Sequence, residues 1–277
     1  MPDRPDTAIA ATRWLDRSEG RVAFECAGHG PLVVCVPGMG QTRRVFDPTA
    51  DLLRRAGFRV GAMDLRGHGD SDATFGAYDD VAAAGDAAAV VREMGGPAVV
   101  VGSSMGAAAA VLVAAEHPDL VRALVLVGPF VRDAPVGRAL ALAWRLVTGG
   151  PWARAAWLAY LPKLYPGRAP ADLAEQRAAI AQSMRRPGHT AAFRRTARTS
   201  HAAAEARLDD VQAPVLVVMG TADPDFADPD GEARWIGDRL GAEVLAVPGA
   251  GHYPHHERPE LVGPAVVAFA RQACARA

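Results

Sequence analysis

The amino-acid sequence predicts an α/β fold in which a mostly parallel, twisted sheet is flanked by helices and carries an all-helical insertion. Short apolar runs alternate with longer helical patterns along the chain, which is typical of repeated βα units. The alternation stops over 131–206, where only helical patterns cut by prolines remain, and it resumes after that segment. We therefore predict one core domain formed by 1–130 and 207–277, and a helical cap (lid) over 131–206.

Each expected element follows from its local pattern. Apolar runs bounded by turn residues predict strands, and apolar residues at helical spacing predict helices. A helix over 81–94 stops at Gly95-Gly96, and an alanine-rich helix over 107–116 is ended by Pro118. The other expected strands are 20–27, 32–36, 59–63, 99–101, 124–127, 214–218 and 244–247, and the other expected helices are 46–56, 232–240 and one that runs to the C-terminus.

The composition is that of a globular protein with a large core, because 50% of the 277 residues are hydrophobic and 22% are charged. The formal net charge of -1 gives no reason to expect a nucleic-acid or membrane partner. We expect no signal peptide, and the apolar stretch over 107–115 is shorter than the ~20 residues that span a bilayer. Three cysteines without zinc-ligand spacing fit a reducing setting, so we expect a cytoplasmic protein with no metal.

The first chemical motif is Gly102-Ser103-Ser104-Met105-Gly106, which matches the pattern G-x-S-x-G. It directly follows the strand over 99–101 and precedes the alanine-rich helix, which is the strand–turn–helix setting that this pattern requires. The sharp turn forces the central residue into a strained backbone conformation, and the flanking glycines remove the Cβ clashes of such a turn. We therefore expect Ser104 to be a nucleophile. A glycine-rich turn without chemistry is the plainer alternative.

A serine hydroxyl needs a base that takes its proton, and His252 is placed for this role. It follows the last expected strand, at the edge of the sheet where ligands bind in open α/β sheets. His255 and His256 lie on the approach to the last helix. Other histidines fit solvated or helix-capping positions: His29, His117, His189 and His201.

An acid must hold the imidazole in the correct tautomer and stabilise its protonated form. Asp223 is placed for this role, just past the strand over 214–218. Asp225, Asp228 and Asp230 on the same loop are rivals, although turn or helix N-cap roles explain them well.

Four segments together resemble the α/β-hydrolase superfamily, in its branch of capped single-domain serine hydrolases that includes esterases, perhydrolases and C–C hydrolases. The likeness covers almost the full chain, and the order of serine, aspartate and histidine is the one that this fold uses. The segments are Val36-Pro37-Gly38-Met39-Gly40, Asp64-Leu65-Arg66-Gly67-His68-Gly69-Asp70-Ser71, Gly102–Gly106 and Gly251-His252-Tyr253-Pro254.

The resemblance implies an oxyanion hole formed by the backbone N–H groups of Met39 and Met105. This chain has Pro37-Gly38 where relatives commonly have His-Gly, but Met39 rather than the proline would be the donor, so the hole is retained. The resemblance also implies that the segment 64–71 shapes a turn, with Arg66 as a buried ion-pair or turn residue.

The implied reaction is a two-step acyl transfer that needs no metal or organic cofactor. We predict that the chain hydrolyses a carboxylic ester of a small, moderately apolar molecule, as a monomer or homodimer. The alternatives within the class are a thioesterase, a lactonase, a perhydrolase and a C–C bond hydrolase. A ligand-sensing or scaffold protein with the same fold is the alternative from a different class.

The cap is rich in aromatic and basic residues. Trp144, Trp152, Trp157 and Tyr160 are expected to line the substrate pocket in part, although core packing explains most of them. Between 131 and 200 the sequence has eleven arginines and Lys163 but only three acidic residues, which gives this segment a formal charge of +9. A solvated helical face is the plainer explanation. The more specific explanation is that these basic residues steer an anionic substrate, such as a carboxylate-bearing ester or an acyl group on a phosphopantetheine carrier.

Overall fold

A single eight-stranded sheet organises the protein, and a computed structural model describes its residues 11–133 and 146–276. The strand order is β1-β2-β4-β3-β5-β6-β7-β8, in which β1, β2 and β4 pair antiparallel and every other neighbouring pair is parallel. The strands are β1 (Arg13–Arg17), β2 (Gly20–Ala27), β3 (Leu32–Val36), β4 (Arg59–Met63), β5 (Ala98–Ser103), β6 (Val121–Val127), β7 (Val215–Gly220) and β8 (Glu243–Val247).

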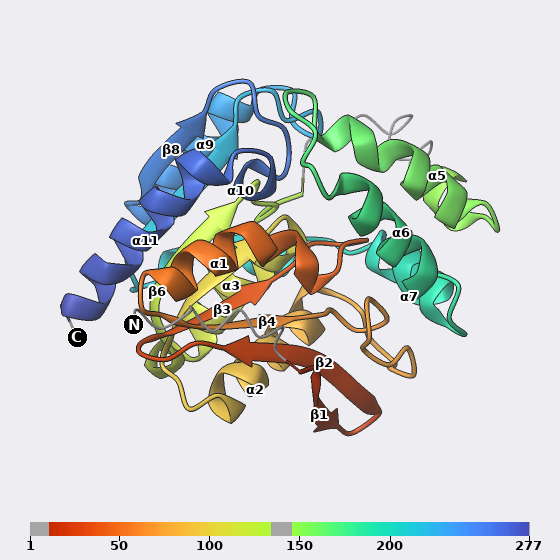
Figure 1. The fold of residues 1–277 in the computed structure, drawn as a ribbon, viewed down its shortest axis with the longest axis horizontal. Coiled ribbons are helices and arrows are strands. Elements are labelled where there is room, and N and C mark those ends of the chain that lie inside the picture. The colour runs from red at the N-terminus through yellow and green to blue at the C-terminus, as the bar shows by residue number, and fades with distance from the viewer. Residues whose placement is uncertain (1–10, 134–145, 277) are drawn as a thin grey trace, which may run out of the picture.

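Helices cover both faces of this sheet, as Figure 1 shows. Successive side chains of a strand point to opposite faces, so Val34 packs in one apolar cluster and Val33 in the other. Helices α2, α3 and α9 contribute to the first cluster, and α1 and α11 to the second. The helices are α1 (Asp47–Arg55), α2 (Asp80–Glu93), α3 (Met105–Glu116), α5 (Ala153–Tyr160), α6 (Leu173–Ser183), α7 (His189–Thr196), α8 (Ala202–Glu205), α9 (Pro229–Leu240), α10 (Pro254–Glu257) and α11 (Pro259–Ala275).

Burial on both faces explains why the central strands are continuous apolar runs. All five residues of β3 and all six of β5 are buried. The alanine-rich sequence of α3 lets that helix lie close to the sheet, and its residues from Met105 to Ala114 are all buried. Cys35 of β3 is fully buried in the core.

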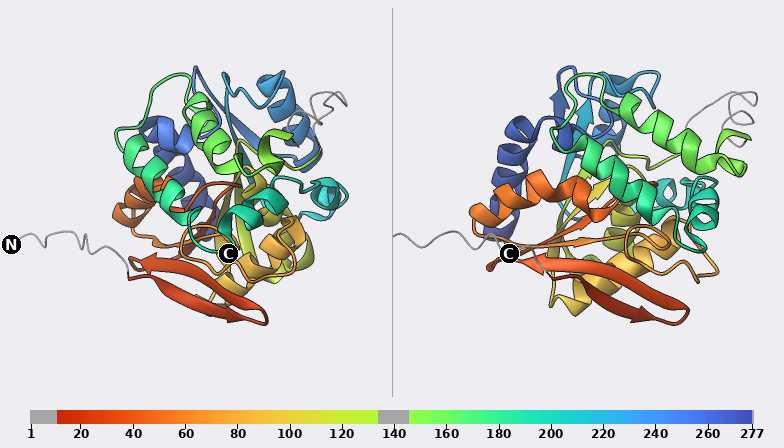
Figure 2. Two further views of the ribbon diagram at one scale, coloured as in Figure 1. Left: turned by 90° about the vertical axis from the view of Figure 1, so that its right-hand side faces the viewer. Right: turned by 45° about the vertical axis from the view of Figure 1, so that its right-hand side comes forward.

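The described residues between β6 and β7 contain helices and turns but no strand. Figure 1 shows α5, α6 and α7 together beyond one end of the sheet, and the two turned views of Figure 2 show the same grouping. These helices contact loops that follow β3 and β4, because Trp157 bonds to Gly40 and Ser183 bonds to Gly69.

The sequence prediction missed strand β1, which pairs antiparallel with β2 at the edge of the sheet. Its sequence Arg-Trp-Leu-Asp-Arg is short, and none of its residues is buried. Leu15 alone packs against the apolar cluster, and one such apolar position in a five-residue edge strand is too weak a pattern to predict a strand.

Candidate active site

Ser104 lies at the turn between β5 and α3, with φ 56° and ψ −124°. It is the one residue other than glycine with a positive φ in the described ranges. Its backbone N–H donates to the Val127 carbonyl oxygen over 2.9 Å, which anchors the turn to the end of β6. Such a strained conformation persists only where the surrounding structure fixes it, and it is commonly found at functional sites.

The glycines on either side of Ser104 are required by close backbone approaches. A Cβ on Gly102 would lie 2.3 Å from the Gly106 carbonyl oxygen, and a Cβ on Gly106 would lie 2.2 Å from the Val36 carbonyl oxygen. Any other residue would force the turn away from β3. The motif therefore holds Ser104 against the segment that follows β3.

His252 lies on the loop after β8, and its side chain is 1% exposed. Its Nδ1 lies 2.7 Å from Asp223 Oδ2, and its backbone N–H donates to the Leu164 carbonyl oxygen over 2.9 Å. Burial lowers the pKa of His252, but the charge and hydrogen bond of Asp223 and the charge of Asp225 outweigh it and raise the pKa above its usual value. The opposite ring nitrogen, Nε2, has no hydrogen-bond partner among the described residues.

On the loop after β7, Asp223 is the acid closest to His252. Asp225 Oδ2 lies 3.8 Å from His252 Nδ1, beyond hydrogen-bond distance. The Asp225 N–H donates to Asp223 Oδ1 over 3.0 Å, so the Asp223 carboxylate is held on both oxygens. Asp228 caps α9 by accepting from Gly231 N–H, and Asp230 lies in the first turn of α9, as their alternative roles predicted.

Metal ions are commonly bound by His, Cys, Asp and Glu side chains. In the described ranges, one group of three such side chains has its possible ligand atoms within 4.8 Å of one another, and it consists of Asp223, Asp225 and His252. These atoms could hold a metal ion. A proton on His252 Nδ1 satisfies the same contacts, because it is donated to Asp223 across the 2.7 Å separation.

The segment after β6 brings the serine and histidine loops together. The Phe130 N–H donates to the Ser104 carbonyl oxygen over 3.3 Å, and the Phe130 ring centroid lies 5.5 Å from that of His252. A Cβ on Gly128 would lie 2.6 Å from the His252 carbonyl oxygen. No hydrogen bond joins Ser104 Oγ to His252 Nε2 among the residues that the structure places, and such bonds often tighten only around substrate.

The loop after β3 runs along the other side of Ser104. A Cβ on Gly38 would lie 2.6 Å from Ser104 Cβ and 3.1 Å from Ser104 Oγ. Met39 follows directly and is half-buried, whereas Met105 is buried and opens helix α3. The first backbone N–H groups of a helix have no partner within it, so the Met105 amide is open to an oxygen at Ser104.

The aromatic residues predicted for the pocket have different surroundings. Trp157 is buried, and its indole N–H donates to the Gly40 carbonyl oxygen over 2.9 Å. The Tyr160 hydroxyl donates to the carboxylate of Asp225. Trp152 is 57% exposed and donates to the Leu146 carbonyl oxygen, so nothing places its ring in a pocket. Trp144 lies outside the described residues.

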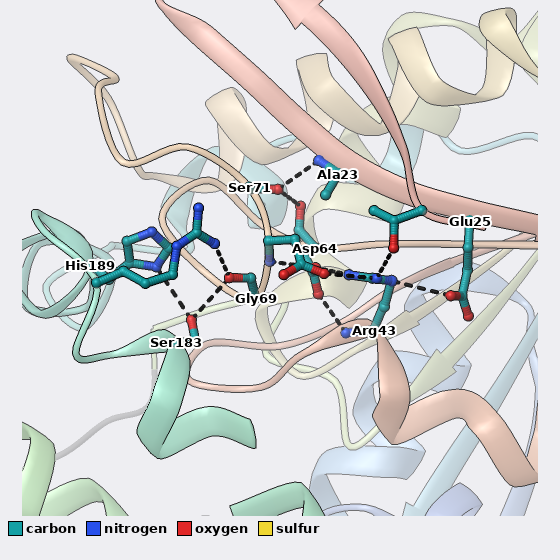
Figure 3. A network of polar contacts seen from close by, with 11 residues as sticks. Ala23, Glu25, Arg43, Asp64, Gly69, Ser71, Ser183 and His189 are labelled. Atoms are coloured by element: carbon teal, nitrogen blue, oxygen red, sulfur yellow. Dashed lines mark hydrogen bonds and ion pairs between the residues drawn. The ribbon is translucent and has the colours of Figure 1, made fainter. Parts of the chain in front are cut away.

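Segment 64–71 forms turns, as expected, with hydrogen bonds from His68 N–H to the Leu65 carbonyl oxygen and from Ser71 N–H to the His68 carbonyl oxygen. Asp64 is fully buried and pairs with Arg43, and its backbone oxygen accepts from the Ser71 hydroxyl (Figure 3). Arg66 pairs with Asp86, with 2.9 Å between Nη2 and Oδ1. Arg66 is half-buried and Asp86 is buried, so of the two expected roles, an ion-pair or a turn residue, the ion pair is confirmed.

One of the histidines predicted to be solvated or capping is buried instead. His189 is 2% exposed, and its Nδ1 lies 3.3 Å from the Ser183 hydroxyl, which itself contacts Gly69 (Figure 3). The prediction for His189 was therefore wrong. His201 is half-buried and occupies the N-cap position of α8, as expected, and its Nδ1 lies 2.8 Å from Asp80 Oδ2. His29 is exposed and His117 lies at the C-terminal end of α3, as expected.

Glu257 is a site residue that the sequence reasoning missed. It is 2% exposed, and its carboxylate accepts from Gly251 N–H over 2.8 Å and from Arg168 N–H over 2.6 Å. It therefore ties the residue before His252 to the helical insertion. Its position five residues after His252 in the same short segment was the available signal.

Known proteins agree with this architecture. A sequence profile described as "Serine aminopeptidase, S33" matches residues 29–259 of the chain. The chain belongs to this family. It is a serine-hydrolase-type α/β hydrolase with the α/β-hydrolase fold, as the sequence predicted. None of the helices among residues 11–133 and 146–276 is long and apolar enough to cross a membrane.

Two curated relatives and one solved structure illustrate the likeness. The 2-(acetamidomethylene)succinate hydrolase of Mesorhizobium japonicum is 32% identical over 275 residues, covering 94% of this chain and 97% of that protein. The pimeloyl-[acyl-carrier protein] methyl ester esterase of Neisseria meningitidis is 32% identical over 231 residues, covering 80% of this chain and 71% of that protein. The epoxide hydrolase CorEH has a TM-score of 0.78 at 22% identity, covering 94% of this chain and 98% of its own.

Proposed function

We propose that the protein hydrolyses a carboxylic ester of a small, moderately apolar molecule, with Ser104 as nucleophile, His252 as base and Asp223 as orienting acid. The observation that carries this proposal is the buried 2.7 Å contact between His252 Nδ1 and Asp223, which leaves Nε2 unpartnered among the described residues. A buried nitrogen without a partner is costly, so it is suited to receive a proton from a reacting hydroxyl. The strained Ser104 turn supplies that hydroxyl on the adjoining loop.

The reaction follows from these positions. Ser104 attacks the ester carbonyl while His252 Nε2 takes its proton, and Asp223 stabilises the imidazolium that forms. The amides of Met39 and Met105 stabilise the oxyanion. His252 then protonates the leaving alcohol, and a water molecule, activated by the same histidine, releases the acid from the acyl-enzyme.

The helical segment over 131–206 acts in this proposal as the cap that selects the substrate, and the core domain comprises 1–130 and 207–277. An ester is favoured over the thioester, lactone, peracid and C–C alternatives because the Neisseria relative is named a methyl ester esterase. Position 104 is serine, which disfavours the aspartate-nucleophile chemistry of epoxide hydrolases and dehalogenases.

Steady-state hydrolysis of p-nitrophenyl acetate and butyrate tests the proposal, with Ser104→Ala as the control. We expect turnover by the natural protein and loss of nearly all of it in the variant, with thermal unfolding unchanged. Matched thioester and lactone substrates in the same assay rank the alternatives. A folded natural protein that turns over none of these substrates would favour a ligand-sensing or scaffold role.

A second candidate function is hydrolysis of an ester that carries a remote anionic group, such as a carboxylate or a phosphopantetheine carrier. Its basis is the charge of the cap. Eight arginines and Lys163 lie between residues 146 and 200, and none of their side chains forms an ion pair with a carboxylate in the described ranges. Arg154, Arg185 and Arg186 line one cavity of about 430 Å³ between α5 and α7.

The names of both curated relatives point the same way. One relative is named for a succinate substrate, which is a dicarboxylate, and the name of the other includes an acyl-carrier protein. Guanidinium groups bind carboxylate and phosphate in bidentate fashion. A methyl ester with a remote carboxylate should therefore have a higher kcat/KM than its neutral isostere. Equal values for the two esters would remove this candidate and leave the first intact.

A further inference from the structure

One turn of helix α5 contacts the candidate site from both sides. Trp157 and Tyr160 are three residues apart, so their side chains lie on the same face of the helix. Trp157 bonds to Gly40, the residue after Met39, and Tyr160 bonds to Asp225, two residues after Asp223. The helical insertion therefore touches the proposed oxyanion loop and the acid loop at once.

Asp225 places a second carboxylate beside His252. Its Oδ2 lies 3.8 Å from His252 Nδ1, and its side chain is 22% exposed. This separation is too long for a hydrogen bond, so Asp225 acts on the imidazole through its charge. An opposite charge at this distance favours the protonated ring, which is the form that exists after His252 has taken the serine proton.

Tyr160 determines where this charge lies. Burial and the neighbouring carboxylate of Asp225 raise the pKa of Tyr160, so its hydroxyl keeps the proton that it donates. Burial, together with the charge of Asp223, raises the pKa of Asp225, whereas His252 and the Tyr160 hydrogen bond lower it. The hydrogen bond therefore helps to keep Asp225 ionised beside a second carboxylate.

We propose that Asp225 is a positioning residue whose charge stabilises protonated His252, and that Tyr160 of α5 holds it there, so that docking of the cap completes the electrostatic surroundings of the base. This inference rests on the proposed function, because it takes His252 to be the base.

The other described groups around His252 carry no negative charge that could stabilise its protonated ring. On its own loop, the ring of Tyr253 lies 4.8 Å from that of His252, and burial with repulsion from His256 and His252 holds the pKa of His255 well below its usual value. From the segments after β6 and β7, the aromatic rings of Phe130 and Phe226 face it. Without Asp225, Asp223 would be the one carboxylate paired with the imidazole among the described residues.

The test is the pH dependence of kcat/KM for p-nitrophenyl butyrate in Asp225→Asn, Tyr160→Phe and the double variant. The rising limb reports loss of the proton from His252. We expect it to move about one pH unit lower in Asp225→Asn, because a charge within ~4–6 Å shifts a pKa by about 1–3. Tyr160→Phe should shift it in the same direction by less, and the double variant should match Asp225→Asn.

Asp230→Asn is the matched control, because it removes an exposed carboxylate from the first turn of α9, where it does not contact His252. The rising limb of its pH profile should lie at the same pH as that of the natural protein. A role of Asp225 in folding alone would lower the thermal unfolding temperature without moving the limb, and that result would overturn the inference. Additive shifts in the double variant would overturn the link to Tyr160.

NMR titration of the His252 imidazole in the same variants provides a readout without turnover. If no ester is hydrolysed, or if Ser104→Ala keeps its activity, the proposed function fails, and the NMR titration still decides whether Asp225 acts on His252. An unchanged His252 titration in Asp225→Asn contradicts the inference whatever the activity.

Discussion

Trp157 packs so closely on Gly40 that a Cβ on that glycine would lie 2.3 Å from the indole ring, and the indole N–H donates to the Gly40 carbonyl oxygen. Gly40 has φ +68°, a conformation that favours glycine. A residue of the helical insertion and a residue of the loop beside Ser104 are therefore fitted to each other.

Trp157→Phe should lower kcat/KM for p-nitrophenyl butyrate by about tenfold, because a 1 Å displacement of a catalytic loop can cost more than that. The lost hydrogen bond and smaller ring should also lower the free energy of unfolding by about 1–3 kcal/mol. Trp152→Phe is the control, since that ring is 57% exposed. Equal effects of the two changes on kcat/KM would show that the contact with Gly40 is unimportant.

Gly38→Ala should impair catalysis more than stability. The new methyl group would lie 2.6 Å from Ser104 Cβ, so either the serine or the loop that carries Met39 must move. We expect kcat/KM to fall at least tenfold. Gly85→Ala on helix α2 is the matched change, because its Cβ would lie 3.9 Å from its nearest contact, the Arg17 side chain, and the change should raise stability by about 1 kcal/mol. Full activity in Gly38→Ala would mean that this loop does not adjoin the reacting centre.

The sheet and the candidate triad could be predicted from the sequence because both depend on local patterns. The runs in β3 and β5 are apolar throughout, and the glycines around Ser104 mark its turn by themselves. His252 and Asp223 each follow a strand, and the parallel sheet brings such loops to one edge.

The remaining features depend on distant partners that no local pattern indicates. Ser183, which bonds to His189, also bonds to Gly69 across 114 residues of sequence, and Tyr160 reaches Asp225 across 65 residues. The cap aromatics were expected to serve mostly in packing, and Trp157 and Tyr160 do contact the core domain. That some of them line the substrate pocket stays a prediction.

Salt should distinguish anionic from neutral substrates. If the unpaired arginines of the cap steer an anion, kcat/KM for a carboxylate-bearing ester should fall as salt rises from 0.1 to 1 M, because the screening length falls from ~10 Å to ~3 Å. The value for a matched neutral ester should stay constant. Arg185→Gln, at the cavity between α5 and α7, should reduce the salt response. Parallel responses of the two esters would mark the arginines as ordinary surface.

His255→Leu should stabilise the protein more at low pH than at high pH. His255 is fully buried against Phe46, and neither ring nitrogen has a partner among the described residues. Burial, with His256 and His252 adding repulsion, holds the pKa of His255 well below its usual value. Below pH ~6.5 the unfolded chain therefore binds a proton at this position that the folded chain does not, and stability is lost as the pH falls.

Urea unfolding at pH 8 and pH 5 measures this effect. The gain of His255→Leu over the natural protein should be about 2 kcal/mol larger at pH 5, from ~1.36 kcal/mol per pH unit over the interval below pH ~6.5. A different fit of leucine in the core would change both values equally. A gain that does not depend on pH would show that His255 binds its proton in the folded protein.

Covalent labelling tests the central claim most directly. A fluorophosphonate reacts with an activated serine, and peptide mass spectrometry locates the adduct. We predict one adduct on Ser104, abolished in Ser104→Ala and slowed strongly in Asp223→Asn, because that change leaves His252 in the wrong tautomer. An adduct on Ser103, or no adduct on the folded protein, would contradict the assignment of Ser104 as the nucleophile.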